Sequence, residues 1–310
     1  MRPFHTSVVL LLALGVHGTN VRAQDEEFDA VDAFLPVAPI PVDTLSSIRN
    51  DQSLPNWYDF VGNVPRDFGK FAGISVDPNS VPAIVGITAL TLGLVASDHE
   101  TYRLSSRIYE SSPTATSVSD FFVSLGDGKS QIMLAGAFGV FGFAASDGRA
   151  LRTASQTLEA LLATGLVVQM LKRVTGRESP SVTTSERGTW RPFPSFASYK
   201  KHQSRYHAYP SGHIATTMST VTVLIENYPE QRWLTPVGYT VVGLVGMGLV
   251  NNGWHWYSDL PLGIALGYVF GRIVSHPAMD YSSINPTDIK LSLEPMINEY
   301  GNGVRLSVQF

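Results

Sequence analysis

The stretch Tyr206–Thr217, YHAYPSGHIATT, places Pro, Ser, Gly and His in a row just before an apolar segment. A proline ends the preceding structure and Ser211 is a favourable N-cap residue, so the stretch predicts a helix that begins at Gly212. The free N–H groups and partial positive charge of a helix N-terminus bind anions. His213, in the first turn, would lie beside such an anion and exchange a proton with it near neutral pH. The stretch therefore predicts an anion site whose other ligands come from elsewhere in the chain.

The composition excludes several kinds of site and gives no sign of a nucleic-acid partner. The chain has 310 residues and a net charge of −4, so its overall charge does not suggest a nucleic-acid partner. It contains no cysteine, which excludes disulfides, thiolate metal sites and cysteine nucleophiles. Arg2, a short apolar run at Val8–Val16 and a small-residue cleavage site after Ala23 are typical of an export signal rather than of a buried helix. We expect residues 1–23 to be this signal, and the protein to be exported to the periplasm or cell envelope.

The remaining chain divides into three parts. Residues 24–80 mix acidic residues, prolines and aromatics, which predicts an irregular extension that packs through Trp57, Tyr58 and Phe60. After Pro286, alternating runs around YGNG predict a small β-hairpin within a C-terminal tail, residues 277–310. Between them, six apolar segments rich in Gly and Ala have the lengths of packed helices, which predicts an all-α domain at 81–276 with a six-helix core bundle. The segments are Val81–Ser97, Gln131–Ser146, Thr157–Val174, Gly212–Tyr228, Thr235–Val250 and Leu260–Val274.

Three polar clusters fall at the ends of these segments. LKRVTGRESP ends the third segment, YPSGH begins the fourth, and NNGWHWYSD joins the fifth to the sixth. If consecutive helices are antiparallel, all three clusters lie at the same end of the bundle. Clusters that are distant in sequence are therefore expected to form one site.

The first two clusters have the chemistry of a phosphate site. Lys172 and Arg177 would supply positive charge and several donors for phosphate oxygens. Ser211 and the amide of Gly212 would add the start of a helix. The expected ligand is a phosphorylated small molecule or lipid.

The third cluster adds a nucleophile. His255 and Asp259 are four residues apart, and a carboxylate bonded to one imidazole nitrogen leaves the other free to attack. His213 would then protonate the leaving oxygen, which describes phosphoryl transfer without a metal. A metal site formed by His213, His255 and Asp259 is the rival chemistry, but Lys172 and Arg177 would repel a cation. We therefore expect no metal and no other cofactor.

The ordered clusters resemble the signatures of the type 2 phosphatidic acid phosphatase (PAP2) superfamily, which includes class A acid phosphatases and vanadium haloperoxidases. The superfamily pattern is K-x6-R-P, then P-S-G-H, then S-R-x5-H-x3-D. Lys172, Pro180, the PSGH and His255-x3-Asp259 match it in order, and the resemblance covers roughly residues 81–276.

The resemblance implies a role for each matched residue. It implies that His255 is the nucleophile that forms a phosphohistidine, and that Asp259 orients it. It implies that His213 protonates the leaving group. It further implies that the phosphate is held by Lys172, Ser211 and the amide of Gly212.

The chain departs from the pattern at both arginines that would clamp the phosphate. Ser179 stands before Pro180 where the pattern has Arg, and Gly248–Leu249 stands where it has Ser-Arg. Each lost charge-assisted bond can cost ~2–4 kcal/mol of transition-state binding. Possible substitutes are Arg177, one turn or so past Lys172, and then Arg191 and Arg205.

Two functions remain open at this point. The first is an exported phosphatase acting on a lipid phosphate, a pyrophosphate or a soluble phosphoester. The second is a non-catalytic envelope protein that keeps the fold, because the two arginines are missing; a haloperoxidase would be weakened by the same loss. The segments are 15–18 residues long, at the short end for a membrane span, so soluble and integral membrane forms both stay open. His202 and His207 are expected in a surface loop.

Overall fold

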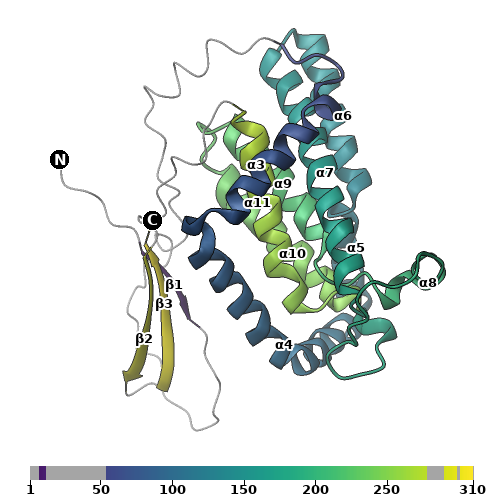
Figure 1. Cartoon of the computed structure of the whole chain (residues 1–310), viewed down its shortest axis with the longest axis vertical. Helices are drawn as coiled ribbons and strands as arrows, with labels where there is room; N and C mark the ends of the chain where they lie inside the picture. Colours follow the sequence, from purple (N-terminus) through teal and green to yellow (C-terminus); the bar gives the residue numbers. More distant parts are fainter. Residues whose placement is uncertain (1–6, 12–53, 278–289, 299–300, 310) are drawn as a thin grey trace. The chain divides into compact units, whose positions relative to one another are not determined.

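The computed structural model describes residues 7–11, 54–277, 290–298 and 301–309. Residues 54–282 form one compact unit, and residues 1–53 with 283–310 form another. All three polar clusters belong to the first unit (Figure 1). Most of the expected export signal, and the extension as far as residue 53, lie outside the described residues.

The described part of the first unit is built from helices, as the sequence predicts. Two helices lie between the second and third clusters of the sequence, and they carry the chain across the unit and back. The start of the first helix, at Gly212, therefore lies near the loop that follows the second (Figure 1). The helices are α2 (Asp59–Gly62), α3 (Val64–Val76), α4 (Val81–Glu110), α5 (Pro113–Leu125), α6 (Gly128–Ala145), α7 (Gly148–Thr175), α8 (Phe196–Lys201), α9 (Gly212–Asn227), α10 (Leu234–Asn251) and α11 (Leu260–Ser275).

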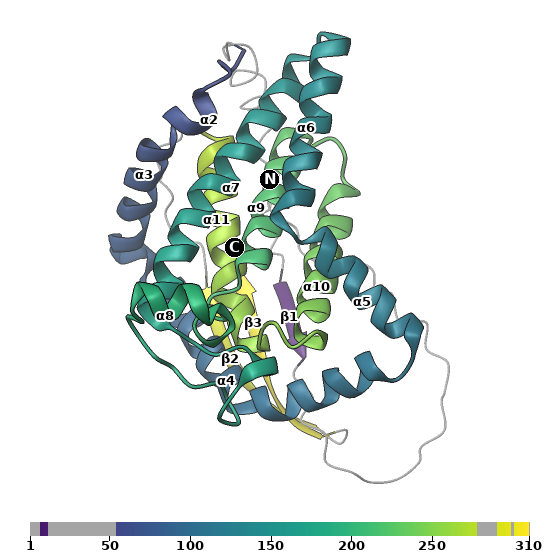
Figure 2. The same cartoon turned by 90° about the vertical axis from the view of Figure 1, so that its right-hand side faces the viewer.

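Helix α9 is the centre of this unit. It contacts α11, α7, α10 and α6, and Figure 2 shows it between α7 and α10. Its approach to α11 is close because glycines line the contact: a Cβ added to Gly267 would lie 2.2 Å from the carbonyl oxygen of Ala215. The first turn of α9 is thereby held against the start of α11, which follows Asp259.

Two apolar clusters hold the helices together. One joins α5, α9 and α10 and includes Ile214, Val245 and Leu249. The other joins α7, α9 and α11 and includes Val168 and Phe270. Both clusters adjoin the first turn of α9, so the core fixes the helix start that the sequence predicts as an anion site.

The segment expected to be irregular contains helices α2 and α3. Trp57 and Tyr58 are 86% and 52% exposed, so they are not the packing residues that the sequence suggested. Phe68 and Phe71, three residues apart on α3, pack against Phe270 instead. Spacing of three places both rings on one helix face, which buries them together.

Helix α5 lies between the first two predicted segments and was not expected. Ser112 caps it by accepting a bond from the Ala115 N–H, and Pro113 occupies the first helical position. These are ordinary helix-start signals, but the polar residues that follow hide the apolar pattern of the segment.

The second unit contains a three-stranded antiparallel sheet in the order β1–β3–β2. Strands β2 (Lys290–Asn298) and β3 (Gly301–Gln309) pair from Lys290↔Gln309 to Asn298↔Gly301, which confirms the hairpin. Gly301 to Gly303, expected in the turn, belong to β3. Strand β1 (Ser7–Leu11) lies in the expected signal and pairs with β3.

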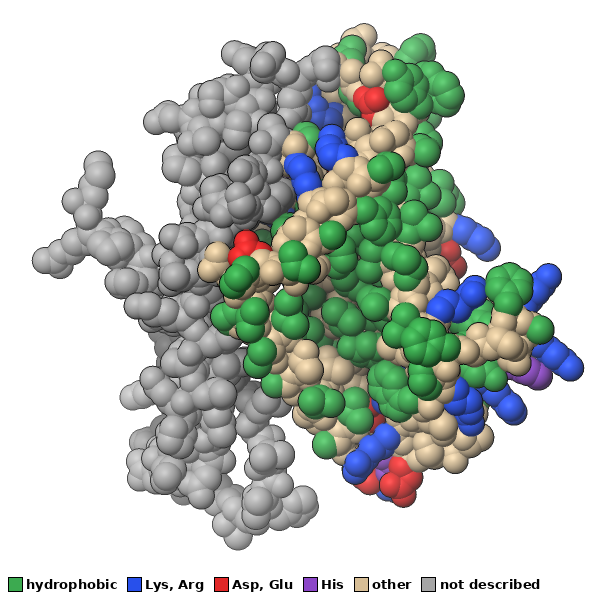
Figure 3. Space-filling view, viewed as in Figure 1, with side chains coloured by type: hydrophobic (Ala, Val, Ile, Leu, Met, Phe, Trp, Pro, Cys, Tyr) green, Lys and Arg blue, Asp and Glu red, His purple; other side chains and the backbone are tan. Residues whose placement is uncertain are grey.

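Within the part of the chain that the structure describes, three helices are long and apolar enough to cross a membrane, and they span Pro78–Glu110, Gly148–Thr175 and Leu234–Asn251. Helix α4 has 30 residues and α7 has 28, so the objection that the segments are too short does not apply to them. Figure 3 shows hydrophobic side chains over a broad area of the described surface. Helices α4 and α6 carry exposed apolar residues, among them Leu92, Met133 and Phe143. These features support membrane association.

Candidate active site

The first cluster is shaped by the turn that ends α7. Gly176 has φ +58, and a Cβ there would lie 1.8 Å from the carbonyl oxygen of Arg191, so only glycine fits. Its N–H bonds to the carbonyl of Lys172 at 3.0 Å. The chain then turns back, and Arg177 forms isolated β-bridges with Trp190 and His207.

The second cluster forms the start of α9. Ser211 caps this helix by accepting a bond from the Ile214 N–H, as predicted. The Ser211 N–H donates to the carbonyl of Asp259 at 2.9 Å, which ties the second cluster to the third. A Cβ added to Gly212 would lie 3.6 Å from Lys172 Nζ, so the buried ammonium sits directly at the helix start. The three clusters therefore meet, as the antiparallel arrangement predicts.

The third cluster places a carboxylate beside a histidine. Asp259 ends a short 3-10 turn, Tyr257–Asp259, rather than sharing a helix with His255. Its Oδ2 lies 3.5 Å from His255 Nδ1 and accepts a 2.8 Å bond from the Trp256 N–H. Both side chains are buried, and burial lowers the pKa of His255. Burial opposes the charge on Asp259, but Arg177 and these bonds outweigh it and hold the pKa of Asp259 below its usual value.

Arg177 has a different position from the one expected. It is buried, and its guanidinium lies between two carboxylates, 2.6 Å from Asp259 Oδ1 and 2.7 Å from Asp98 Oδ2. One amino group also donates to Ser258 Oγ at 2.6 Å, and the other to the carbonyl of Arg187 at 2.7 Å. Both amino groups of Arg177 have protein partners. Arg177 therefore holds Asp259 in place and does not offer two free amino groups to a phosphate. Asp98, on α4, and Ser258 complete this network, and no signal in the sequence pointed to either residue.

The other two candidate arginines also lie away from a free clamp position. Arg191 is paired with Glu178, whose pKa is lowered to about 2 because hydrogen bonds from Thr184 and Arg191 outweigh burial. Arg205 is exposed on the surface. The expectation that one of the three guanidinium groups faces the space between His213 and His255 is not met by these contacts.

The two positions of the missing arginines are closed by packing. Leu249 is fully buried in the apolar cluster of α5, α9 and α10, and a Cβ added to Gly248 would lie 2.8 Å from the carbonyl oxygen of Ser119. Ser179 is 1% exposed, and its hydroxyl has no hydrogen-bond partner among the described residues. Neither position therefore has free space for an arginine side chain in this packing.

Three histidine rings gather at the start of α9. The ring of His255 lies 6.2 Å from that of His213 and 6.5 Å from that of His207. Burial, then the charges of His255 and Lys172, lowers the pKa of His213 to about 4. His207 was expected in a surface loop; it does lie in a loop, but it is only partly exposed and its Nδ1 is buried. Its one signal in the sequence is that it lies three residues before Pro210, on the segment that delivers Ser211 to the site.

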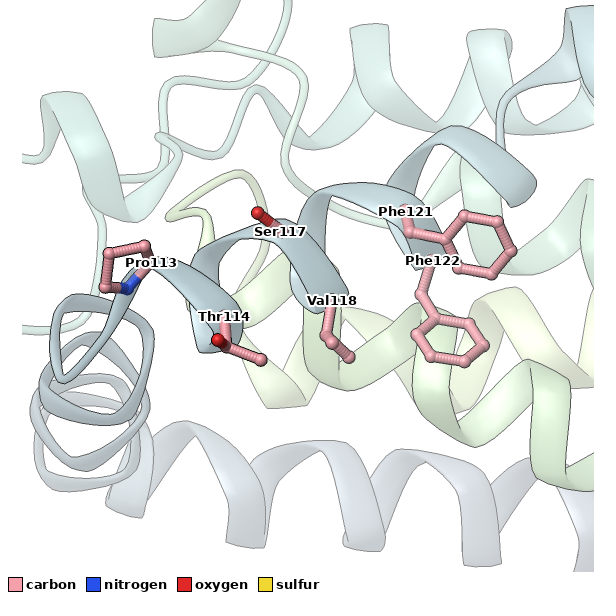
Figure 4. A pocket seen from close by; sticks show the side chains of 6 residues that line it. All are labelled: Pro113, Thr114, Ser117, Val118, Phe121 and Phe122. Carbon is pink, nitrogen blue, oxygen red and sulfur yellow. The ribbon is translucent and has the colours of Figure 1, made fainter.

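A separate groove of about 510 Å³ runs along α5, away from these residues. Figure 4 shows its lining, in which the rings of Phe121 and Phe122 lie with centroids 5.2 Å apart. The lining side chains are Pro113, Thr114, Ser117, Val118, Phe121 and Phe122, which include two hydroxyl groups but no histidine, carboxylate or lysine to act as a general acid or base near neutral pH. The groove therefore lacks the acid and base groups that the candidate site at the start of α9 offers.

Comparison with known proteins agrees with the motif analysis. Residues 154–280 match the family model described as the PAP2 superfamily. Lipid A 1-phosphatase of Porphyromonas gingivalis is 32% identical over 80 residues, which are 26% of this chain and 18% of that protein, so the match spans less than a fifth of the relative. The crystal structure of a transmembrane PAP2-type phosphatidylglycerolphosphate phosphatase from Bacillus subtilis has a TM-score of 0.44 and 17% identity, covering 64% of this chain and 98% of that one. The family-model match confirms the resemblance to the superfamily, and together with the P. gingivalis relative it supports a phosphatase.

Proposed function

Because residues 154–280 match the PAP2 superfamily model, we propose that this protein is a metal-independent phosphatase that works through a phosphohistidine on His255. The observation that carries the proposal is the junction at the start of α9. There the Ser211 N–H bonds to the Asp259 carbonyl, and Lys172 Nζ lies against Gly212. A nucleophile, its orienting carboxylate, a cation and free helix amides thus meet at one point.

The contacts suggest how the reaction proceeds. His255 has Nδ1 towards Asp259, which leaves Nε2 to attack phosphorus and form the N–P bond as the P–O bond to the leaving group breaks. His213 gives its proton to the leaving oxygen. Water then attacks the phosphohistidine, His213 takes up a proton from it, and phosphate and free His255 are regenerated.

We extend the proposal to a phosphate ester carried by a membrane lipid. The apolar exposed helices would keep the protein at a bilayer, where such a substrate is concentrated. The relative from P. gingivalis is named as a phosphatase of lipid A, which is consistent with this class of substrate.

One observation favours the alternative of a protein that keeps the fold without catalysis. The two arginine positions hold Ser179 and Leu249, and Leu249 is part of the core. A site without both guanidinium groups would have to bind the transition state with other charges.

The deciding experiment is hydrolysis of p-nitrophenyl phosphate and of a lipid phosphate in mixed micelles, with and without EDTA. We expect turnover that EDTA does not affect, a loss of at least about 10³-fold in His255→Ala, and a loss of about 10²–10⁴-fold in His213→Ala. His202→Ala, which changes an exposed histidine of the preceding loop, is the matched control and should retain full activity.

The nature of the intermediate gives a second readout. Acid-labile, alkali-stable radiolabel should be trapped on the wild-type protein and be absent from His255→Ala. Activity that EDTA removes and a divalent ion restores would establish the metal alternative. A wild-type protein that binds oxyanions and hydrolyses nothing would establish the non-catalytic one.

A further inference from the structure

The start of α9 has few fixed positive charges for a site that would hold a phosphate dianion. Lys172 is the buried cation beside Gly212, while Arg177 and Arg191 are paired with carboxylates. We propose that His207 is a third phosphate-binding histidine, which takes up a proton as the anion binds and so supplies charge that the superfamily pattern obtains from arginine. The proposal rests on the proposed function only in using the same anion site.

The backbone fixes His207 beside the nucleophile. His207 forms a parallel β-bridge with Arg177, and the N–H of Ala208 bonds to the Arg177 carbonyl at 3.0 Å. Arg177 is itself locked by Asp98 and Asp259. The ring of His207 is consequently held near that of His255, with an interplanar angle of 24°. A loop histidine with no function would not need this anchoring.

One nitrogen of His207 is ready for a ligand. Nδ1 is buried and has no hydrogen-bond partner among the described residues. Buried polar atoms nearly always have a partner, and an orphan one calls for an explanation. A phosphate oxygen beside His255 would provide the missing partner, and a protonated imidazole would donate to it with the strength of a charge-assisted bond.

The surrounding charges explain why His207 would be protonated only when an anion is bound. Groups on every neighbouring element face His207: Lys172 on α7, His213 on α9, and His255 with Asp259 in the third cluster. Burial first, and then Lys172 and the two histidines, lowers the pKa of His207 to about 3, against a weaker opposing effect of Asp259. A dianion at the helix start would reverse the sign of this field and favour the imidazolium. Because the histidines interact, the proton gained belongs to the cluster of His207, His213 and His255, and the share that His207 takes is what a His207 variant measures.

Proton uptake on binding is directly measurable. The full-length protein in a mild nonionic detergent would be titrated with tungstate, a tetrahedral oxyanion, by calorimetry at pH 7 in buffers of different ionisation enthalpy. We expect net uptake of a substantial fraction of a proton per tungstate bound. Linkage then requires that affinity rises as pH falls from 8 towards 6.

A variant assigns the proton to His207. In His207→Gln we expect about tenfold weaker tungstate binding and clearly reduced proton uptake, because one charge-assisted bond is lost. His202→Gln, in the same loop and exposed, is the matched control and should behave as wild type.

The outcomes separate this proposal from the proposed function. Binding by the wild type without proton uptake overturns it, even if His207→Gln fails to fold, and so does uptake that is unchanged in a folded His207→Gln. Tungstate binding with uptake but no hydrolysis supports it while rejecting catalysis. No tungstate binding at all overturns both.

Discussion

The side of the site that orients His255 and the side that faces the phosphate are built very differently. On the orienting side, Asp98, Arg177, Ser258 and Asp259 are all buried and bonded to one another at 2.5–2.7 Å. On the phosphate side, the Lys172 ammonium lies against Gly212, and His207 Nδ1 has no hydrogen-bond partner among the described residues. The orienting side is densely bonded, although Arg177 Nε and His255 Nδ1 also lack a hydrogen-bond partner there. The phosphate side has more unused bonding capacity.

The difference indicates which groups bond to other protein groups and which would bond to a bound anion. Taking two carboxylates and a guanidinium out of water costs several kcal/mol per ion, so such a network persists only with very good geometry. Here that geometry fixes Asp259, which faces the nucleophile. Groups left without protein partners on the opposite side are those that a bound anion would satisfy.

The largest expected effect comes from removing the cation of the network that orients His255. Arg177→Met would leave Asp98 and Asp259 buried without their cation, and we expect a loss of about 3–5 kcal/mol in the free energy of unfolding. Activity would disappear with it, because Asp259 could no longer be held beside His255. Denaturation followed by circular dichroism measures the first effect, and phosphatase assay the second.

The control for this variant is Arg205→Met, which removes an exposed arginine from the same loop region. It should change stability by no more than about 0.5 kcal/mol. A stable Arg177→Met protein with normal activity would mean that the network does not position Asp259.

A substitution on the side that faces the phosphate should reduce activity without reducing stability. Lys172→Met replaces a buried ammonium by an apolar chain of similar length, so stability should be unchanged or rise by up to about 1 kcal/mol. Phosphate binding loses its fixed charge, and kcat/KM should fall by about 10²–10³-fold. The two variants would thus separate folding from binding.

Lys200→Met, on α8 and exposed, is the matched control and should affect neither quantity. If Lys172→Met destabilises the protein as much as Arg177→Met does, both sides of the site serve the fold and the contrast between them is lost.

The sequence predicted the parts of the molecule that depend on local signals. The cap at Ser211, the start of α9 at Gly212 and the apolar helices all follow from residue pattern, and antiparallel packing is enough to bring the clusters together. Helix α5 and the packing of Phe68 and Phe71 were not predicted, because polar and small residues interrupt the apolar periodicity of these segments.

The roles within the site could not be read in the same way. Arg177 and Arg191 are basic residues in the right region, but which carboxylate each meets is set by loops that fold back after Gly176. Leu249 stands at an arginine position of the superfamily pattern, and only the packed structure shows that it belongs to the core. Replacing it by arginine would bury a charge, so restoring the pattern there tests folding rather than catalysis.

The mildest change, Ser258→Ala, tests whether the network acts on chemistry or only on folding. The Ser258 hydroxyl donates to Asp98 at 2.5 Å and accepts from Arg177 at 2.6 Å. Its loss should cost about 1–2 kcal/mol of stability and lower kcat several-fold, while KM stays constant because Ser258 does not touch substrate in the proposed reaction. Ser258→Thr keeps the hydroxyl and should restore most of kcat.

The pH dependence of Ser258→Ala distinguishes positioning from a purely structural role. Arg177 depresses the pKa of Asp259, so this carboxylate contributes stability that is present above its unfolded pKa of about 3.9 and is lost as pH falls below it. If Ser258 keeps Arg177 against Asp259, its removal weakens that contribution. The stability gap between wild type and variant should then be widest near neutral pH and narrow as pH falls below about 4. The acid limb of the kcat profile should also move to higher pH, since Asp259 would be protonated more easily. A gap that is constant with pH, together with an unmoved acid limb, would show that Ser258 contributes only packing and that Arg177 holds Asp259 without its help.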